Sequence, residues 1–239
     1  MVVTGGSGGI GRALVAAFAA SGATVAATSR SGHVADVAHA LAMELENADS
    51  VIAAVEDAAS RLGGLDTLVV NAVRWPDGFP EHFEDLDPRE WRAVLRANVE
   101  GSFSLLQAAL PALRESDSGR IVLISSGAAE EGHPPAPHYI AAKAALHGLC
   151  RALAWDAGRD GVLINVIAAG FTRTATNAGR FPADLFERAG ALTPQRRVSS
   201  GDDVAALALW LGSPANSSVT GEVVREGTSA ARTPLVALD

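Results

Sequence analysis

Short runs of apolar, often β-branched residues alternate along the chain with alanine-rich stretches of helical period. Apolar runs bounded by turn residues predict strands, and apolar positions that recur every three or four residues predict helices. The predicted strands are Met1–Thr4, Ala23–Thr28, the weaker Leu41–Leu45, Leu65–Asn71, Arg120–Ser125, Val162–Ala168 and Glu222–Arg225. The predicted helices are Ile10–Ser21, Ser50–Leu62, Pro88–Leu113, His138–Gly158 and Asp202–Leu211. This alternation indicates βαβ units and an α/β fold with a parallel sheet.

Two longer segments, Val73–Asp87 and Phe171–Val198, interrupt the alternation, and the second contains a possible short helix near Ala183–Ala189. Both follow predicted strands, and open α/β sheets bind ligands at the carboxyl ends of their strands. Since long loops in compact domains are usually functional or disordered, we expect these two to border a substrate site. Their aromatic residues are candidate apolar contacts, although anchoring of the loops explains them equally well: Trp75, Phe79, Phe171 and Phe181.

Composition narrows the classes of protein to consider. The 239 residues are 48% hydrophobic and carry a net charge of −8, with scattered arginines, so a folded protein is expected and a nucleic-acid partner is disfavoured. No linker rich in Gly, Ser or Pro divides the chain, which favours one domain over residues 1–239. Cys150 is the only cysteine, and neither a signal peptide nor a membrane-length apolar run is evident. We therefore expect a cytoplasmic protein with no membrane partner, and we predict no metal site.

A glycine-rich turn, TGGSGGIG over residues 4–11, joins the first predicted strand to the first predicted helix. Glycine lets the backbone approach a pyrophosphate closely, and the helix N-terminus supplies free N–H groups and a positive dipole. Glycine-rich turns also have purely structural uses. The position of this one, at the start of a βαβ series, favours a dinucleotide site.

The end of the second strand bears on the choice of cofactor. An NAD site usually places an acidic residue there, about 20 residues past the glycines, to hold the ribose 2′-OH. This chain has Ser29 and Arg30 instead, and a guanidinium can bind a 2′-phosphate in a bidentate manner. The pattern favours NADP(H). It leaves NAD(H) open, because Arg30 can equally be an ordinary solvated residue and Gly8 brings no basic side chain to the turn.

The only tyrosine and the only lysine of the chain, Tyr139 and Lys143, lie four residues apart at the start of a predicted helix. Residues at i and i+4 share one helix face, so an ammonium could stabilise the phenolate and lower a pKa that is ordinarily near 10. A phenol tuned in this way can act as a general acid. An amphipathic helix whose Tyr and Lys merely flank the core is the alternative.

Two further polar residues are placed where they could join this pair. Ser126 follows an apolar strand and precedes Tyr139 by thirteen residues, so we expect it at the ligand-binding edge of the sheet, together with Ser125. Asn98 lies inside a predicted helix, where an amide adds little to helix propensity and suggests another task. A packed polar residue is the other interpretation of Asn98.

The spacing TGxxxGxG, followed by Asn98, Ser126, Tyr139 and Lys143 in that order, resembles the fingerprint and catalytic tetrad of the short-chain dehydrogenase/reductase family. The resemblance extends from Met1 to about Gly227. It implies a doubly wound Rossmann fold with a seven-stranded parallel sheet and helices on both faces. It also implies an NAD(P)-dependent oxidoreductase acting on a carbonyl–alcohol pair.

The resemblance further implies roles for particular residues. Tyr139 would donate the proton to a ketone oxygen, Lys143 would hold the nicotinamide ribose and lower the pKa of Tyr139, Ser126 would bind the carbonyl, and Asn98 would position a relay water. The expected cofactor-binding residues are Thr4, Gly5, Ser7, Gly9, Ile10, Gly11, Ser29, Arg30, Glu44, Leu45, Asn71, Ala72, Tyr139, Lys143, Gly170, Thr172 and Thr174.

Several positions depart from the family pattern. The usual NNAG is VNAV at residues 70–73, the usual Pro-Gly has Ala169, and the acidic residue after the third strand is Glu44 rather than Asp. The segment Ser31–Ala40 is too short for a second crossover helix, and the first strand begins at Met1 itself, which suggests a trimmed amino terminus. These departures bear on cofactor affinity and local stability, and none removes a chemical group of the tetrad.

The leading hypothesis is therefore an NADPH-dependent ketone reductase acting on a polyketide, an acyl or another bulky ketone. An alcohol dehydrogenase acting in the oxidative direction would use the same residues and stays open. A non-catalytic NADP(H)-binding regulator is disfavoured, because such a protein would be expected to lose the tetrad. An enoyl reductase is disfavoured as well, because members of that group usually space Tyr and Lys more widely.

The two long segments and their borders carry Arg74, Arg173 and Arg180, which suit a bulky ketone as readily as a small alcohol. His133 and His138, which precede or begin the predicted catalytic helix, could touch substrate, although solvated loop histidines are the favoured alternative. The resemblance also implies a tetramer that assembles through the helices Pro88–Leu113 and His138–Gly158. The second helix, with Trp155, could be buried in that interface, but the core of a single molecule could use the same helix equally well.

Overall fold

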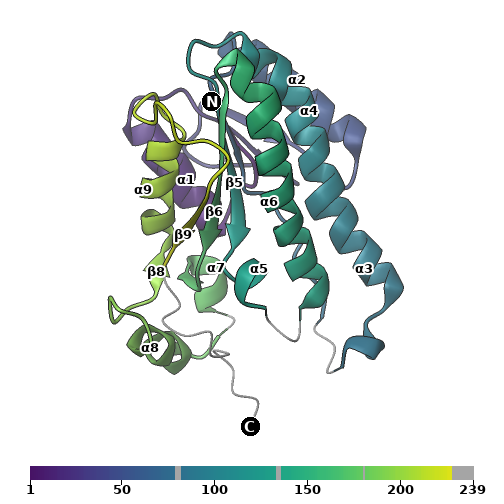
Figure 1. Ribbon diagram of the computed structural model, residues 1–239, viewed down its shortest axis with the longest axis vertical. Coiled ribbons are helices and arrows are strands. Elements are labelled where there is room, and N and C mark those ends of the chain that lie inside the picture. The colour runs from purple at the N-terminus through teal and green to yellow at the C-terminus, as the bar shows by residue number, and fades with distance from the viewer. Residues whose placement is uncertain (79–81, 133–135, 180, 228–239) are drawn as a thin grey trace.

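A computed structural model of the chain describes residues 1–78, 82–132, 136–179 and 181–227. Its centre is a sheet of seven parallel strands in the order β3-β2-β1-β4-β5-β6-β9 (Figure 1). The strands are β1 (Val2–Val3), β2 (Ala26–Ser29), β3 (His39–Ala42), β4 (Thr67–Val70), β5 (Arg120–Ser126), β6 (Leu163–Ala169) and β9 (Val223–Glu226). Strand order reverses between β1 and β4, which places a ligand crevice at their carboxyl ends.

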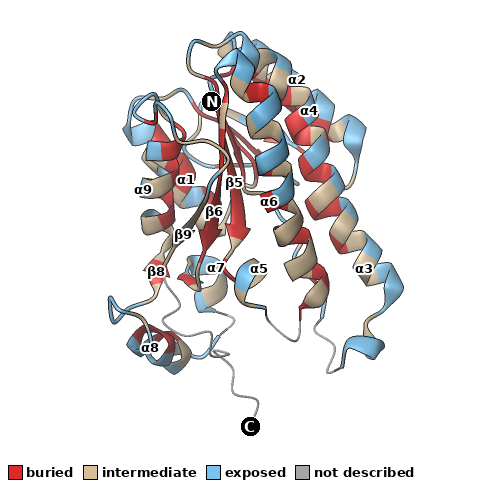
Figure 2. Ribbon diagram, in the orientation of Figure 1, coloured by how far each residue is buried: buried red, intermediate tan, exposed pale blue. Residues whose placement is uncertain are grey.

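Helices cover both faces of the sheet (Figure 1). One layer contains α1 (Gly9–Ala20) and α9 (Gly201–Leu211), which pack against each other, and the other contains α2 (Ala48–Leu62), α4 (Gly101–Arg114) and α6 (Pro137–Ala157). Each layer encloses its own apolar cluster, and the buried residues lie on the strands and on the helix faces turned toward them (Figure 2). The prediction of a doubly wound seven-stranded α/β fold is confirmed.

Shorter elements complete the fold. They are η1 (Phe83–Asp85), α3 (Pro88–Leu95), η2 (Arg96–Glu100), α5 (Ala128–Glu131), η3 (Gly158–Asp160), β7 (Thr172–Arg173), α7 (Ala175–Ala178), α8 (Ala183–Ala191) and β8 (Ser199–Ser200). The predicted loop 171–198 thus contains two helices, and its ends are joined because β7 pairs with β8. The short helix expected near Ala183–Ala189 corresponds to α8.

The third strand was predicted two residues too far along the chain. It is β3, His39–Ala42, rather than Leu41–Leu45, and its register pairs His39 with Ala26 and Ala42 with Ser29. Leu41 is the only buried residue of this edge strand, so the hydrophobic pattern carries little information about its register. The segment between β2 and β3 contains no helix, as its length predicted.

The predicted helix Pro88–Leu113 is divided in the structure. Residues 96–100 form a turn of π-helix, η2, between α3 and α4. Such a turn inserts one residue, and helical periodicity resumes beyond it, so the prediction ran through as a single helix. π-Helical turns are frequent at functional sites, and this one contains Asn98.

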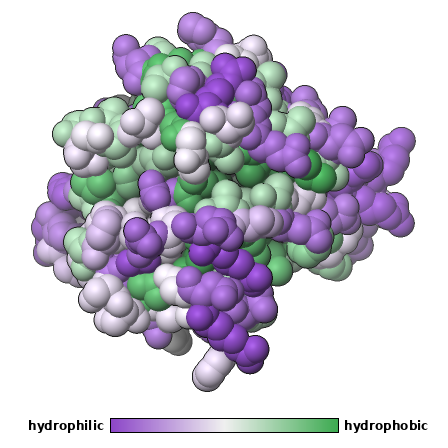
Figure 3. Space-filling model, turned by 90° about the horizontal axis from the view of Figure 1, so that it is seen from above, coloured by the Kyte–Doolittle hydropathy of each residue, from purple (hydrophilic) through white to green (hydrophobic). Residues whose placement is uncertain are grey.

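The amino terminus lies at the end of the molecule opposite to the carboxyl ends of β5 and β6 (Figure 1). Viewed from the end where the chain begins, the surface is a mixture of hydrophilic and hydrophobic side chains (Figure 3). The opposite end, where β5 and β6 finish, is covered by α5, α7 and α8 (Figure 1). None of the helices in the described part of the chain is both long and apolar enough to cross a membrane.

Candidate active site

The glycine turn at the end of β1 has the backbone geometry of a phosphate cradle. Gly5 and Gly9 adopt positive φ angles of 68° and 55°, which side-chain-bearing residues rarely adopt. A Cβ on Gly11 would collide with the Gly5 carbonyl oxygen and would lie 2.9 Å from Asn71 Nδ2. The N-terminus of α1 can therefore approach a ligand closely, and this cradle fits the pyrophosphate of a dinucleotide cofactor.

Thr4 and Asn71 join the turn to the neighbouring strand β4. The buried Thr4 hydroxyl accepts hydrogen bonds from the N–H groups of Asn71 at 2.9 Å and of Ala72 at 3.0 Å. Asn71 Nδ2 donates to the carbonyl oxygen of Thr4 at 2.9 Å. Both residues are thus bound within the protein, and their hydrogen bonds hold the glycine turn at the β1–β4 switch point. Ser7 is exposed and Ile10 half-buried at the rim of the same turn.

The adenosine end of the predicted site contains a free cation. Arg30 is exposed at the end of β2, and no hydrogen bond or ion pair to it occurs among the described residues. Ser29 is buried, and its hydroxyl donates to the carbonyl oxygen of His33 at 3.0 Å. Glu44 is exposed, whereas Leu45 packs against Gly101 at the start of α4. Among the described residues no hydrogen bond or ion pair joins Glu44 or Leu45 to the glycine turn.

The segment that follows β6 lies beside the glycine-rich turn. The Gly170 N–H donates to Glu226 O at 2.8 Å, and the Thr172 hydroxyl donates to Gly170 O at 2.9 Å. Thr174 caps α7, where its hydroxyl accepts from Asn177 N–H at 3.3 Å. The N–H of Gly9 donates to the Thr176 hydroxyl at 3.1 Å, so Thr176 lies at the amino end of α1. Sequence reasoning missed Thr176, although it lies only two residues after the predicted Thr174.

The predicted Ser–Tyr–Lys group assembles where α6 crosses the end of β5. Lys143 is buried, and its Nζ donates to the carbonyl oxygen of Ile124 at 2.7 Å. The same Nζ lies 5.9 Å from the centroid of the Tyr139 ring. Ser126 Oγ accepts from the Ala128 N–H at 3.3 Å, and the Ser126 hydroxyl is hydrogen-bonded to Tyr139.

The ionisation of this group differs from the sequence-based expectation. Burial raises the pKa of Tyr139 to about 12, and the hydrogen bond from Ser126 acts in the opposite direction with a smaller effect. Burial also lowers the pKa of Lys143 to about 8. In the protein alone the pKa of Tyr139 shifts upward, against the expectation that Lys143 lowers it, because desolvation of the phenolate is the largest cause. At neutral pH Tyr139 is held as a protonated phenol.

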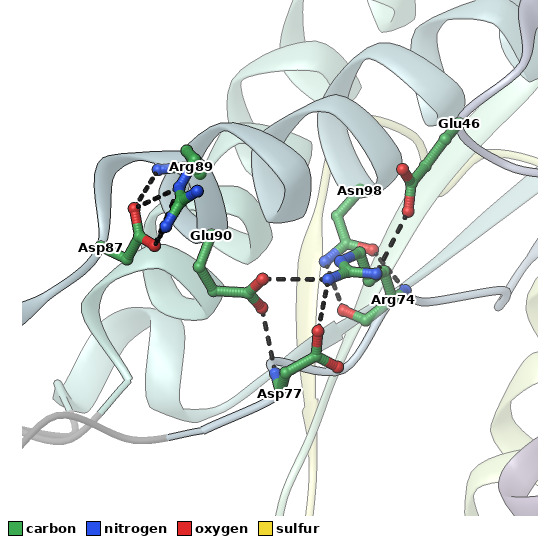
Figure 4. A network of polar contacts seen from close by, with 7 residues as sticks. All are labelled: Glu46, Arg74, Asp77, Asp87, Arg89, Glu90 and Asn98. Carbon is green, nitrogen blue, oxygen red and sulfur yellow. Dashed lines mark hydrogen bonds and ion pairs between the residues drawn. The ribbon is translucent and has the colours of Figure 1, made fainter.

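Asn98 is buried in η2 and binds the main chain after β4. Its Oδ1 accepts from the Arg74 N–H at 2.8 Å, and its Nδ2 donates to the Arg74 carbonyl oxygen at 2.9 Å (Figure 4). Since η2 also packs against α6, Asn98 and Tyr139 belong to the same packed unit.

Aromatic side chains from the two long segments border the site. The exposed Trp75 indole lies with its centroid 4.7 Å from that of Tyr139. In the second segment Phe171 stacks on Phe186 at 5.1 Å and meets Phe181 edge-on at 5.6 Å. Sequence reasoning missed Phe186, whose α8 position gave only a helical signal. Three candidates lie outside the described residues: Phe79, His133 and Arg180.

Comparisons with known proteins agree with this geometry. A family model described as "Enoyl-(Acyl carrier protein) reductase" matches residues 5–225. The chain is 34% identical to acetoacetyl-CoA reductase of Synechocystis over 94% of its length and 93% of the relative's. It is 31% identical to 7alpha-hydroxysteroid dehydrogenase of Escherichia coli K12, with 93% and 90% covered. The structure of a putative short-chain alcohol dehydrogenase from Sinorhizobium meliloti superposes with a TM-score of 0.86 at 33% identity, covering 94% and 92%.

The chain belongs to the short-chain dehydrogenase/reductase family. It is an oxidoreductase that interconverts a carbonyl and an alcohol with a nicotinamide cofactor. The expected departures from the family pattern leave the site assembled, because Asn71 still bridges β4 to the glycine turn although its neighbours are Val70 and Val73.

Two histidines of α6 complete the surroundings of the site in this family member. His138 is fully buried rather than solvated, and neither ring nitrogen has a hydrogen-bond partner among the described residues. Its pKa is lowered by burial, with Glu90 acting in the opposite direction. The buried His147, which sequence reasoning missed, lies one turn beyond Lys143 and meets the Ser125 hydroxyl at 2.9 Å. Its i+4 spacing from Lys143 was the available signal.

Proposed function

We propose that this chain is an NADPH-dependent ketone reductase. The observation that carries the proposal is the grouping of the Tyr139 phenol with Ser126 and with the buried Lys143, whose Nζ lies 5.9 Å from the centroid of the Tyr139 ring, where α6 crosses the end of β5. A general acid must hold its proton at working pH and lie within reach of the atom it protonates, and this phenol meets the first condition. The buried Lys143 brings a positive charge close to this phenol, and the exposed Trp75 indole places an apolar surface beside it.

Each residue then has a defined task. The bound cofactor supplies the hydride. Ser126 donates a hydrogen bond to the substrate carbonyl oxygen and orients it, and Tyr139 transfers its proton to that oxygen as the alkoxide develops. Lys143 has one N–H bound to Ile124 and keeps two for the ribose hydroxyls of the nicotinamide half. Asn98 holds a water that returns a proton to Tyr139.

The preference for NADPH rests on Arg30. Its guanidinium is exposed at the end of β2 without a partner among the described residues, so it can bind a 2′-phosphate without breaking an internal contact. A carboxylate at this position would repel that phosphate. The remaining cradle, formed by residues 4–11 with Asn71 and Thr172 to Thr176, accommodates either dinucleotide.

The names of the relatives bear on the direction of the reaction and on the class of substrate. The relatives named acetoacetyl-CoA reductase and 3-oxoacyl-[acyl-carrier-protein] reductase favour reduction of an acyl or other bulky ketone. The relative named 7alpha-hydroxysteroid dehydrogenase favours the second candidate, oxidation of an alcohol by the same residues. A non-catalytic regulator does not need Tyr139 placed between Ser126 and Lys143, so this arrangement favours an enzyme.

We also propose that the chain assembles with copies of itself through α4 and α6, as a cytoplasmic tetramer. Trp155 on α6 is 82% exposed and Phe103 on α4 is 51% exposed in the single chain. The core of the same molecule does use α6, through Leu146 and Cys150, whereas Trp155 lies outside that core. Light scattering on the wild type and on Trp155→Asp tests this assembly, and a monomeric wild type would contradict it.

The experiment that tests the reductase proposal compares wild type with Tyr139→Phe. Ketones and alcohols are assayed by the absorbance of the reduced nicotinamide, and NADPH binding is measured by calorimetry. We expect ketone-dependent oxidation of NADPH by the wild type and its loss in Tyr139→Phe, with NADPH affinity nearly unchanged. Full turnover in Tyr139→Phe would refute the mechanism, and turnover of alcohols alone would favour the dehydrogenase.

A further inference from the structure

Both polar atoms of the Asn98 side chain are bound to one residue, Arg74. The Arg74 N–H donates to Asn98 Oδ1 at 2.8 Å, and the Arg74 carbonyl oxygen accepts from Asn98 Nδ2 at 2.9 Å. The plane of the Asn98 amide is therefore set by the position of the Arg74 main chain. Whatever holds that main chain in place also holds Asn98.

The side chain of Arg74 provides such a restraint. Its terminal Nη2 lies 2.9 Å from Glu90 Oε2 and 2.8 Å from Asp77 Oδ2, and its Nη1 lies 3.4 Å from Glu46 Oε1. The three carboxylates come from different parts of the chain: α3, the segment after β4, and the turn before α2 (Figure 4). One guanidinium thus connects the loop that follows β4 to two helical regions.

Glu90 is the principal partner. Its side chain is 19% exposed, whereas that of Asp77 is 78% exposed, and exposed ion pairs contribute little. Glu90 also accepts the Asp77 N–H at 3.0 Å through its second oxygen, so it binds both the arginine and the loop. The pKa of Arg74 is raised mainly by its hydrogen bond to Glu90. Glu90 therefore anchors the loop to α3.

The same contacts bear on whether Arg74 could bind an anionic group of a substrate. The guanidinium faces three carboxylates at 3.4 Å or less, and its surroundings carry a net negative charge. An incoming anion would have to displace a carboxylate and would be repelled by the other two. The structure thus indicates a role inside the protein for Arg74.

We infer that Arg74 is a positioning residue that, anchored by Glu90, holds Asn98 in its working orientation. The inference rests on the proposed function, in which Asn98 orders the relay water. Without the guanidinium, the loop after β4 loses its ion pair with Glu90 on α3, and the Arg74 peptide groups can shift away from η2. The chemical step slows, because misplacement of a supporting group by about 1 Å can cost two orders of magnitude in rate.

A double-mutant cycle tests this dependence. Arg74→Met keeps the apolar stem and removes the charge, and we expect kcat to fall about tenfold to a hundredfold with KM for NADPH nearly unchanged. If Arg74 acts through Asn98, the same substitution made in Asn98→Ala should cause no further loss. Multiplying losses in the double variant, or an unchanged kcat in Arg74→Met, would overturn the inference.

Two further variants keep the test sharp. Glu90→Gln retains size and should show a smaller loss of kcat that also vanishes in the Asn98→Ala background, which serves if Arg74→Met does not fold. Arg61→Met removes the same charge from an exposed helical ion pair with Asp57 on α2 and should leave kcat unchanged. A loss in Arg61→Met equal to that in Arg74→Met would show a general effect of charge and would overturn the inference.

A readout independent of turnover separates this inference from the proposed function. The side-chain amide protons of Asn98, assigned in NMR spectra with Asn98→Ala, should exchange slowly in the wild type and in Arg61→Met. They should exchange faster in Arg74→Met. Unaltered exchange in Arg74→Met would overturn the positioning role even if the protein reduces ketones. Faster exchange in a protein that reduces no ketone would support the positioning role and refute the proposed function alone.

Discussion

The indole of Trp75 and the phenol of Tyr139 are in ring contact, with their centroids 4.7 Å apart and their planes at 55°. The two residues are 64 positions apart in the sequence, and the contact joins the loop after β4 to the first turn of α6. Trp75 is still 44% exposed, so part of the indole remains available to a ligand that reaches Tyr139. If a ketone binds at Tyr139, as proposed, we expect one of its substituents to contact this surface.

Trp75 is therefore expected to select substrates that carry a ring. Trp75→Ala should lower kcat/KM for benzylacetone about tenfold, because an aromatic contact contributes about 0.5–1.5 kcal/mol beyond its buried area. Butanone, which has the same methyl ketone without the ring, should be affected little. The measurement is the ratio of kcat/KM for the two ketones. Trp210→Ala is a matched control on α9, since Trp210 is also 44% exposed, and an equal change of the ratio there would contradict the assignment.

Arg30 is expected to determine the choice between the two cofactors. Arg30→Ala should weaken NADPH about tenfold to a hundredfold, because a hydrogen bond between charged groups contributes about 1.5–3 kcal/mol, and it should leave NADH binding nearly unchanged. Calorimetric Kd values for both cofactors provide the test. Arg61→Ala, on α2, controls for loss of positive charge. An NADPH/NADH preference that survives in Arg30→Ala would exclude Arg30 as the phosphate ligand.

The glycine cradle allows a matched pair of substitutions. Gly11→Ala brings a Cβ into collision with the Gly5 carbonyl oxygen, so we expect lower stability and no measurable cofactor binding. Gly148→Ala, inside α6, meets no atom within 4 Å and should be neutral or stabilising by about 0.5–1 kcal/mol. Thermal unfolding and calorimetric titration with NADPH distinguish the two variants. Normal binding in Gly11→Ala would contradict the close approach of backbone and ligand.

The pH dependence of reduction should reflect Lys143. Its pKa is lowered to about 8 by burial, so the ammonium is present below that pH and is lost as the pH rises through it. We expect kcat/KM to fall above about pH 8 in wild type. The pKa of Tyr139 is raised to about 12, so the phenol stays protonated over the whole range. Lys143→Arg, which cannot be deprotonated there, should move the fall to higher pH in whatever activity remains. If kcat/KM falls at the same pH in Lys143→Arg as in wild type, the fall must arise from another group.

The same ionisations predict how stability depends on pH. Between about pH 8 and the ordinary lysine pKa of 10.5 the unfolded chain binds more protons than the folded one, so Lys143 makes stability rise with pH. Between 10 and about 12 the folded chain retains the Tyr139 proton that the unfolded chain has lost, so stability falls. Urea unfolding across this range measures both effects. Lys143→Met should remove the first of them and Tyr139→Phe the second.

Local regularities in the sequence sufficed for much of this molecule. Hydrophobic periodicity located six of the seven sheet strands closely, because the repeats of helices and strands arise from neighbouring residues. Tyr139 and Lys143 share a helix face through their i, i+4 spacing alone. The phosphate-binding turn required only that glycines stand between a strand and a helix. The one poorly placed strand, β3, lies at the sheet edge, where burial imposes a weak pattern.

Only the tertiary structure decided the relations between distant segments. The binding of Asn98 to the Arg74 main chain, the contact of Trp75 with Tyr139 and the burial of His138 depend on how whole elements pack. The direction of the Tyr139 pKa shift also escaped prediction, since it is dominated by the desolvation that packing imposes on the phenol. The sequence by itself thus determined which chemical groups line the site. Packing decided their contacts and their protonation, because solvent exclusion is a property of the assembled fold rather than of any local segment.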